Sequence, residues 1–126
     1  MTTRKYYESM TRNKVIPQEW REYLELIAPA RWVTQNQFVA TVLQGAHEDI
    51  KLDQTTVSHW RRGTIVPPRG TIVSAVGVAF KREPLEALVA AGIVDIDWVV
   101  DSLSSNALAT LKKIGITPTK KKEVVK

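Results

Sequence analysis

The hydrophobic residues of the chain recur at the three- and four-residue spacing of amphipathic α-helices. A first helix is expected to begin at Pro17, which suits a first helical position, and to end before Pro29. Its apolar side consists of Trp20, Tyr23, Leu24 and Ile27. A second helix is expected at "TQNQ", Thr34 to Gln37, where a hydroxyl and a glutamine three residues later form a capping box. Its apolar side consists of Phe38, Val39, Val42 and Leu43.

The stretch "LDQTTVSHWRRGT", Leu52 to Thr64, predicts a short helix with two different sides. Asp53 suits the N-cap position, and Gly63 suits the position after the last turn. Val57 and Trp60 lie three residues apart and are expected to be buried. The opposite side carries Gln54, Thr55, Ser58, His59 and Arg62.

Two more helices are expected after the break "IVPPRG", and residues 96–114 form one or two others. The fourth helix is marked by Ile72, Val73, Val76, Ala79 and Phe80. The fifth begins at Pro84 and ends at Gly92. The last segment carries Leu108, Leu111 and Ile114 on one stripe. The pattern predicts an all-α fold with a main domain at 15–94, a flexible basic arm at 1–14, a helical appendage at 95–117 and a basic disordered tail at 118–126.

The composition of this chain of 126 residues and 14.2 kDa limits the classes of partner and binding site that are expected. The net charge of +5 and the pI of about 9.6 favour a polyanionic partner. The absence of cysteine excludes disulfides and cysteine zinc sites, and His47 and His59 cannot form a four-ligand site alone. No apolar run approaches the ~20 residues of a membrane span, and the N-terminus lacks the apolar core of a signal peptide. We therefore expect a cytoplasmic protein with no metal, no cofactor and no membrane contact.

The polar side of the helix at 53–62 carries hydrogen-bonding groups rather than the Glu–Lys pairs of an ordinary solvated helix. Side chains of the Gln, Thr, Ser, His and Arg kind read base edges in the major groove of DNA. An ordinary exposed helix is the alternative reading of this stretch. No nucleophile–base pair, carboxylate pair or phosphate-binding glycine loop occurs at a useful spacing, so an enzyme with a small-molecule substrate is not expected.

From Val33 to Gly92, roughly half of the chain, the order of helices resembles a known DNA-binding family. The residues that carry the likeness are Thr34, Gln35, Phe38, Val39, Val57, Ser58, Trp60 and Gly63. This order is similar to the five-helix helix-turn-helix domain of the phage repressor and Cro family, also called XRE-type. The stretch "ALVAAGIV", Ala87 to Val94, also looks like the last core helix of actinobacterial and actinophage members. The resemblance implies that residues 15–94 form the DNA-binding domain and that 95–117 is appended to it.

Two features depart from the family pattern. The connection between the two motif helices, "QGAHEDIK" at residues 44–51, is several residues longer than usual, so the second helix runs longer or the turn bulges. The helix at 53–62 ends in Trp60-Arg61-Arg62-Gly63 where Trp-Glu-Asn-Gly is usual. Two guanidinium groups in place of an acid and an amide are expected to strengthen phosphate contacts.

Matched position by position, the resemblance implies roles for single residues. The predicted base contacts are Gln54, Thr55, Ser58 and His59. The predicted phosphate contacts are Gln35, Arg61, Arg62 and Arg69, of which Arg62 has guanine as an alternative partner. Trp60 is expected in the core. Arg4 and Lys5 are candidates for an arm in the minor groove, with solvated termini as the alternative for this arm and for the basic tail.

Three functions remain open at this point. The first is a sequence-specific double-stranded DNA-binding transcriptional repressor, specifically a phage immunity (lysogeny) repressor acting at the nucleoid of a bacterial host. The second is an antitoxin that autoregulates its operator and binds a toxin through residues 95–126. The third is a basic helical interaction protein that reads no sequence. The apolar residues of 96–114 need a surface: a second subunit would give a homodimer on a pseudo-palindromic operator, and the chain's own core would give a monomer on an asymmetric site.

Overall fold

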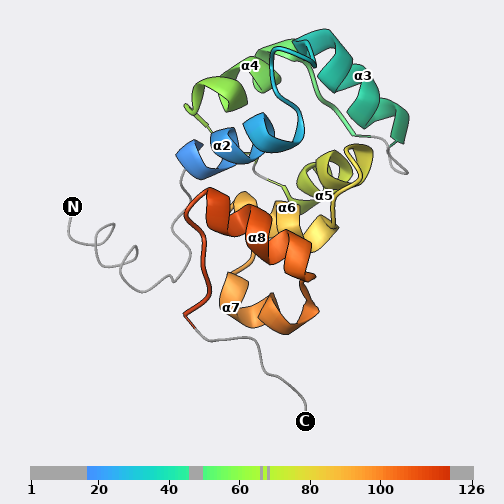
Figure 1. The fold of residues 1–126 in the computed structure, drawn as a ribbon. Helices are drawn as coiled ribbons and strands as arrows, with labels where there is room; N and C mark the ends of the chain where they lie inside the picture. Colours follow the sequence, from blue (N-terminus) through green and yellow to red (C-terminus); the bar gives the residue numbers. More distant parts are fainter. Residues whose placement is uncertain (1–16, 46–49, 66, 68, 120–126) are drawn as a thin grey trace, which may run out of the picture.

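The computed structural model describes residues 17–45, 50–65, 67 and 69–119. Within these residues it contains seven α-helices, one short 3-10 turn and no strand, so the all-α expectation is confirmed (Figure 1). The elements are α2 (Pro17–Ile27), α3 (Gln35–Gly45), α4 (Gln54–Arg62), α5 (Gly70–Ala79), α6 (Pro84–Ala90), α7 (Ile96–Val99), η1 (Val100–Ser102) and α8 (Ser105–Lys113). No described helix is long and apolar enough to cross a membrane. The predictions on the arm 1–14, on His47 and on the tail from residue 120 fall outside the described residues.

The helix ends lie where local sequence chemistry placed them. At the start of α3, the Thr34 amide donates to Gln37 Oε1 at 2.9 Å, and the Gln37 amide donates to Thr34 Oγ1 at 3.2 Å. The capping box is therefore confirmed. Asp53 caps α4 by accepting from the Thr56 amide at 2.8 Å. Gly63 follows α4 with a φ of 73°, a left-handed conformation that glycine adopts without a steric penalty.

Aromatic side chains connect the first four helices in the centre of the molecule. Trp60 of α4 meets the Trp20 ring of α2 edge-on, with centroids 5.7 Å apart, and meets the Phe38 ring of α3 at 6.4 Å. Phe38 in turn lies 5.0 Å from Phe80, the residue that ends α5. Because Trp60, Trp20 and Phe38 are fully buried, the expectation that Trp60 belongs to the core is confirmed.

Helices α5 and α6 approach each other closely through a glycine. A Cβ at Gly77 would lie 3.1 Å from the Cβ of Ala87, tighter than an ordinary contact. Both residues are buried. The small side chains at these two positions therefore set the distance between α5 and α6.

The C-terminal segment packs onto the same core as the preceding helices. Its residues in that core are Ile96, Leu103, Ala107, Leu111 and Ile114, and α8 lies against α6 (Figure 1). Two other apolar residues of 96–114, which were expected to pack on the chain's own core or on a second subunit, are not buried in that core: Trp98 is 79% exposed and Val99 is partly buried. The reason is that α7 is a single turn of four residues, and one turn can bury only one side.

A buried polar cluster joins α2, α6 and α8. The Tyr23 hydroxyl donates to Glu86 Oε1 at 2.6 Å, and Arg82 binds both carboxylate oxygens of Glu86 at 2.7 and 2.6 Å. Arg82 Nη2 also donates to Thr110 Oγ1 at 2.8 Å. Burial and the bond to Glu86 raise the pKa of Tyr23, while the bond to Glu86 raises that of Arg82. Glu86 is fully buried, and these partners satisfy its charge.

Candidate nucleic-acid interface

Helices α3 and α4 lie beside each other at one end of the molecule (Figure 1). Helix α3 ends at Gly45, within the connection expected at 44–51, and α4 begins at Gln54, so the connection is long, as the sequence indicated. Residues 46–49 of that connection are not described. Its last part is fixed, because Leu52 is buried in the core and Asp53 caps α4. The position of α4 is therefore set by the residues at its start and by the packing of its buried side.

The two sides of α4 differ as the sequence predicted. Val57 and Trp60 are fully buried against α2 and α3. On the other side, Gln54, Thr55 and Arg62 are exposed, and Ser58 and His59 are half-buried. The helix thus turns a row of hydrogen-bonding side chains toward solvent while its apolar residues anchor it.

His59 and Arg62 form a local pair on this side of α4. Arg62 Nη2 lies 3.3 Å from His59 Nδ1, and Thr64 Oγ1 lies 3.2 Å from the same nitrogen. A guanidinium group can only donate, so Nδ1 accepts in the Arg62 contact. The Thr64 hydroxyl already donates to the His59 carbonyl oxygen at 3.1 Å, so Nδ1 donates in the Thr64 contact. The two contacts therefore belong to different tautomers of His59. The sequence placed both residues on this side of the helix, and their spacing of three agrees with that.

Arg61 has a different environment from Arg62, its neighbour in sequence. Its Nη2 donates to the carbonyl oxygens of Ala28 and Val33, at 3.2 and 2.7 Å, and its guanidinium carbon lies 5.5 Å from the centre of the Phe38 ring. Burial lowers the pKa of Arg61, and nearby Glu25 opposes this effect. Its predicted phosphate contact stays a prediction, but Arg61 already links α4 to the loop between α2 and α3.

The other predicted phosphate contacts lie at helix starts. Gln35 is the first residue of α3 and is half-buried, and Arg69 is exposed immediately before α5. The amides of the first turn of a helix have no acceptor within that helix, which suits them to phosphate oxygens. The candidate arm residues Arg4 and Lys5 lie outside the described residues.

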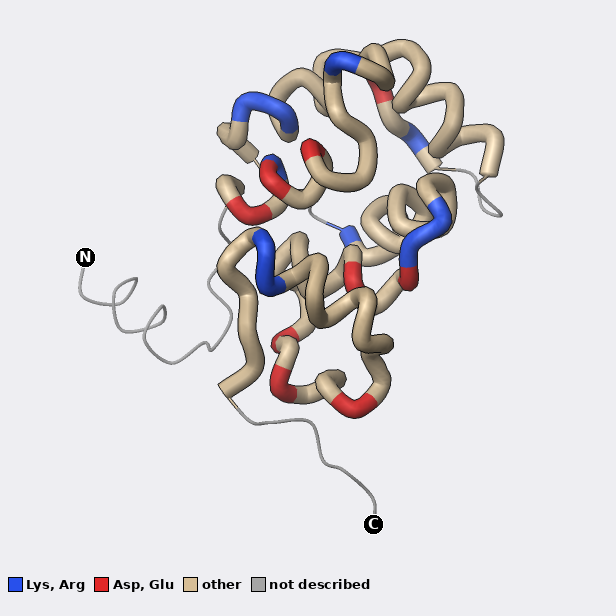
Figure 2. The backbone as a smooth tube through the Cα atoms, in the orientation of Figure 1, with Lys and Arg blue, Asp and Glu red and all other residues tan. Residues whose placement is uncertain are grey.

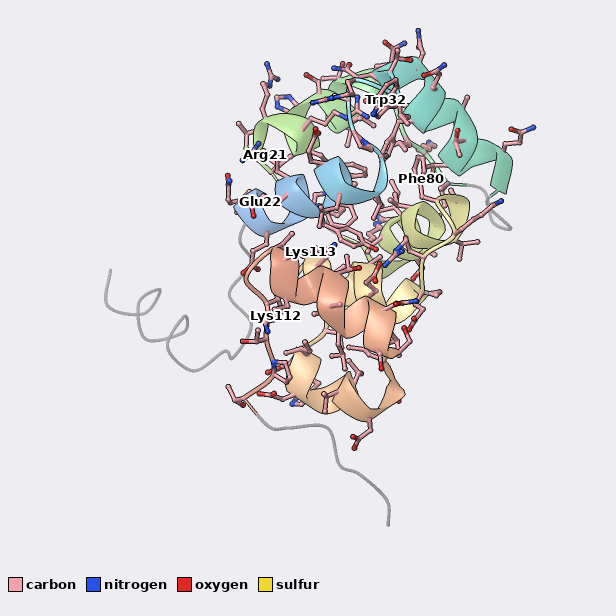
Figure 3. The ribbon with its side chains drawn as sticks, in the orientation of Figure 1. Arg21, Glu22, Trp32, Phe80, Lys112 and Lys113 are labelled. Carbon is pink, nitrogen blue, oxygen red and sulfur yellow. The ribbon has the colours of Figure 1, made fainter. Side chains whose placement is uncertain are left out.

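The structure also brings forward two residues that the sequence reasoning missed. Arg31 and Trp32 are exposed in the loop between α2 and α3, and Trp32 is 73% exposed (Figure 3). The signal in the sequence is an arginine next to a tryptophan in the stretch of four residues between Pro29 and Thr34.

Charge is distributed unevenly along the described chain. In the full sequence, the basic residues between positions 31 and 69 are Arg31, Lys51, Arg61, Arg62 and Arg69, and the acidic residues are Glu48, Asp49 and Asp53. Between Arg82 and Lys112, by contrast, there are five acidic residues and no lysine or arginine. Figure 2 shows this difference, with acidic positions around α7 and η1 at the end opposite α3 and α4.

No family model, no curated protein and no solved structure matches this chain. The residues and their geometry therefore carry the functional argument.

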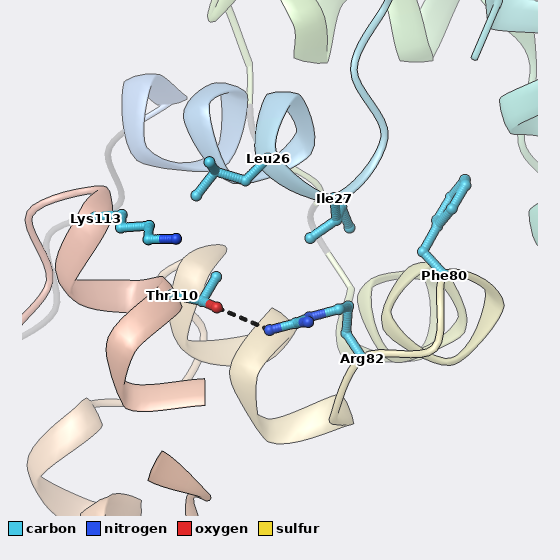
Figure 4. A pocket seen from close by; sticks show the side chains of 6 residues that line it. All are labelled: Leu26, Ile27, Phe80, Arg82, Thr110 and Lys113. Carbon is cyan, nitrogen blue, oxygen red and sulfur yellow. Dashed lines mark hydrogen bonds between the residues drawn. The ribbon is translucent and has the colours of Figure 1, made fainter. Parts of the chain in front are cut away.

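One pocket of about 300 Å³ lies away from α4, between α2, α8 and the α5–α6 connection (Figure 4). Its lining consists of Leu26, Ile27, Phe80, Arg82, Thr110 and Lys113. Arg82 is already bound to Glu86 and Thr110, as Figure 4 shows for Thr110. The charge of Arg82 is therefore already paired with Glu86, and Lys113 is the other cation in the lining.

Proposed function

We propose that the chain is a sequence-specific double-stranded DNA-binding transcriptional repressor that reads the major groove with α4. In this proposal α3 and α4 are the two helices of a helix-turn-helix, and a phage immunity repressor is the specific role. The observation that carries the proposal is the orientation of α4, whose apolar residues Val57 and Trp60 are fully buried while its hydrogen-bonding side faces solvent. A binder that used charge alone would not need this row of uncharged polar groups.

Each predicted base contact has a specific chemistry. Gln54 can bind the N6 and N7 edge of adenine, and the methyl group of Thr55 can meet the thymine methyl. A ring N–H of His59 can donate to the O6 and N7 acceptors of guanine, and Arg62 Nη2 lies beside the ring, 3.3 Å from Nδ1. Gln54 and Thr55 lie in the first turn of α4, the end of a recognition helix that approaches the groove floor.

Phosphate contacts position the helix on the duplex. Arg62 and Arg69 are exposed cations near the polar side of α4 and the start of α5, and Gln35 begins α3. We propose that Arg61 contributes through the loop it holds, because its guanidinium group already binds Ala28 and Val33. Such contacts raise affinity for all sequences alike.

We propose that a single chain reads an asymmetric site. The apolar residues of 96–114 that a homodimer would use are largely buried in the chain's own core, and Trp98 is the large exception. The acidic residues of α7 and η1 make that end a poor second surface for DNA. The mass of the protein on and off DNA tests this point: a dimer, together with a pseudo-palindromic site, would contradict it.

The main test starts with selection of bound duplexes from random DNA. The selected duplex and a random duplex are then titrated at one fixed salt concentration. Gln54→Ala and His59→Ala are each expected to lose ~1–3 kcal/mol on the selected duplex and almost nothing on the random one. Asn106→Ala, an exposed polar residue of α8, is the matched control and should change neither affinity.

Two results would contradict the proposal. If the selection enriches no sequence, the chain is not a specific reader. If both variants lose affinity equally on the two duplexes, the polar side of α4 binds phosphates rather than bases.

A further inference from the structure

Trp32 is an exposed aromatic residue on a tightly built loop. The Trp32 and Val33 amides both donate to the Pro29 carbonyl oxygen at 2.9 Å. Thr34, the next residue, is held by both bonds of the capping box. A side chain on so well-bonded a turn is presented in a restricted set of positions, yet 73% of Trp32 remains in contact with solvent.

The loop is bound directly to α4. Arg61 donates to carbonyl oxygens at both ends of the loop, Ala28 before it and Val33 within it. Thr34 then caps α3. The loop therefore touches both helices of the proposed DNA-binding unit, and Figure 3 places Trp32 at the α3–α4 end, away from Lys112 and Lys113 on α8.

We propose that the Arg31–Trp32 loop is a second DNA-binding element that contacts the sugar–phosphate backbone beside the groove read by α4. This inference rests on the proposed function. Trp32 packs its ring against deoxyribose and donates its indole N–H to a phosphate oxygen, and Arg31 pairs with a phosphate. An indole suits this surface because it combines a large apolar face with a single donor.

Arg61 is a positioning residue in this arrangement. It touches no DNA and sets the distance between the loop and α4 through its two carbonyl contacts. Because every duplex has the same backbone, the loop adds affinity without sequence preference.

The first test is a salt titration of binding to a mixed-sequence duplex, for which no operator is needed. Trp32→Ala is expected to weaken binding about tenfold with an unchanged log–log salt slope, because an uncharged contact releases no counterion. Trp32→Phe retains an aromatic ring but not the N–H donor, so its affinity should lie between those of the parent protein and Trp32→Ala. Arg31→Ala is expected to reduce the slope by roughly 0.9.

Matched controls come from the opposite end of the molecule. Trp98→Ala removes an equally exposed tryptophan, and Lys112→Ala removes an exposed cation of α8. Both should bind like the parent protein. Equal binding by Trp32→Ala and the parent protein, or equal losses in Trp32→Ala and Trp98→Ala, would overturn the proposal.

The second test observes Trp32 directly. In a Trp98→Phe background, Trp32 is the exposed tryptophan of the described chain, since Trp20 and Trp60 are fully buried. Acrylamide quenching of the fluorescence should fall when the duplex is added. Unchanged quenching with bound DNA would show that a different surface meets the backbone. Absence of DNA binding by the parent protein would instead reject the proposed function itself.

Discussion

The α3–α4 end and the α7–α8 end share one hydrophobic core but present opposite surfaces. At the first end, α4 turns hydrogen-bonding residues outward, and the neighbouring cations include Arg31, Arg62 and Arg69. At the second end, α7 and η1 carry Asp97 and Asp101 and no cation, and the exposed cations Lys112 and Lys113 lie in the last turn of α8. Buried residues hold both ends in place, so the difference lies in the surface residues.

This difference shows that the net charge of the chain is a poor guide to its partner. Within the described residues, lysine and arginine are almost balanced by aspartate and glutamate. Most of the net charge of +5 comes from the rest of the chain. Among the described residues, a polyanion would be attracted to the exposed arginines near α4 and repelled from Asp97 and Asp101 on α7 and η1.

Tryptophans at the two ends provide the comparison with the largest expected effect. Trp60→Ala should cost ~3–5 kcal/mol of unfolding free energy, because it leaves a cavity between α2, α3 and α4. Trp98→Ala, at a largely exposed residue, should change stability by no more than about 0.5 kcal/mol. Urea denaturation of both variants measures this. Normal stability of Trp60→Ala with lost DNA binding would mean that the polar side of α4 was assigned wrongly.

The cluster around Glu86 tests whether the two ends form one cooperative unit. Glu86→Ala leaves Arg82 and Tyr23 without their shared partner and should cost ~3–5 kcal/mol. Thr110→Val removes only the bond from α8 and should cost about 1 kcal/mol. Hydrogen exchange should show faster exchange in both α2 and α8 for Glu86→Ala. Faster exchange in α8 alone would show that the C-terminal segment unfolds separately.

Substitutions of the two adjacent arginines, Arg61 and Arg62, should have different effects, one on the stability of the fold and the other on DNA binding. Arg61→Ala should lower stability by about 1–3 kcal/mol, because two hydrogen bonds from a charged group are lost. Arg62→Ala should leave the melting temperature unchanged and reduce the salt slope of DNA binding by roughly 0.9. Thermal melts and salt titrations of both variants are needed. An equal loss of slope in the two variants would restore the phosphate contact predicted for Arg61 from the sequence.

A smaller, pH-dependent effect is expected at the start of α4. Hydrogen bonds from the backbone amide and the side-chain hydroxyl of Thr56 lower the pKa of Asp53 below its ordinary value of 3.8. The ionised cap therefore stabilises the fold above pH 3.8, and this contribution is lost as pH falls through the lowered pKa. Asp53→Asn still caps the helix but carries no charge, so its melting temperature should depend less on pH. If the melting temperatures of the two proteins fall in parallel as the pH is lowered below about 5, this prediction is wrong.

Local chemistry made much of the fold predictable. The Thr34–Gln37 box, the Asp53 cap and Gly63 are each determined by residues within a few positions, and all three are present. The buried side of α4 followed in the same way, because helical periodicity alone separates Trp60 from Gln54.

Tertiary contacts account for what the sequence did not reveal. Arg61 and Arg62 are equivalent by composition, and only the loop between α2 and α3 gives Arg61 its carbonyl partners. Trp98 was expected to be buried with the other apolar residues of 96–114, but no element of the described residues covers that side of α7. The exposure of Trp32 likewise depends on how a turn is directed rather than on residue type.

The way α4 is anchored has a consequence for engineering the chain. Leu52 and Asp53 fix the start of α4, and α3 is held by its own packing on α5 up to Gly45, whose Cβ would lie 3.9 Å from Ala79. The contacts that hold α3 end at Gly45, and those that hold the start of α4 begin at Ile50, which packs against the core. Doubling the length of a loop costs only about 0.6 kcal/mol of closure entropy. A peptide tag inserted between Gly45 and Ile50 is therefore expected to leave both helices in place.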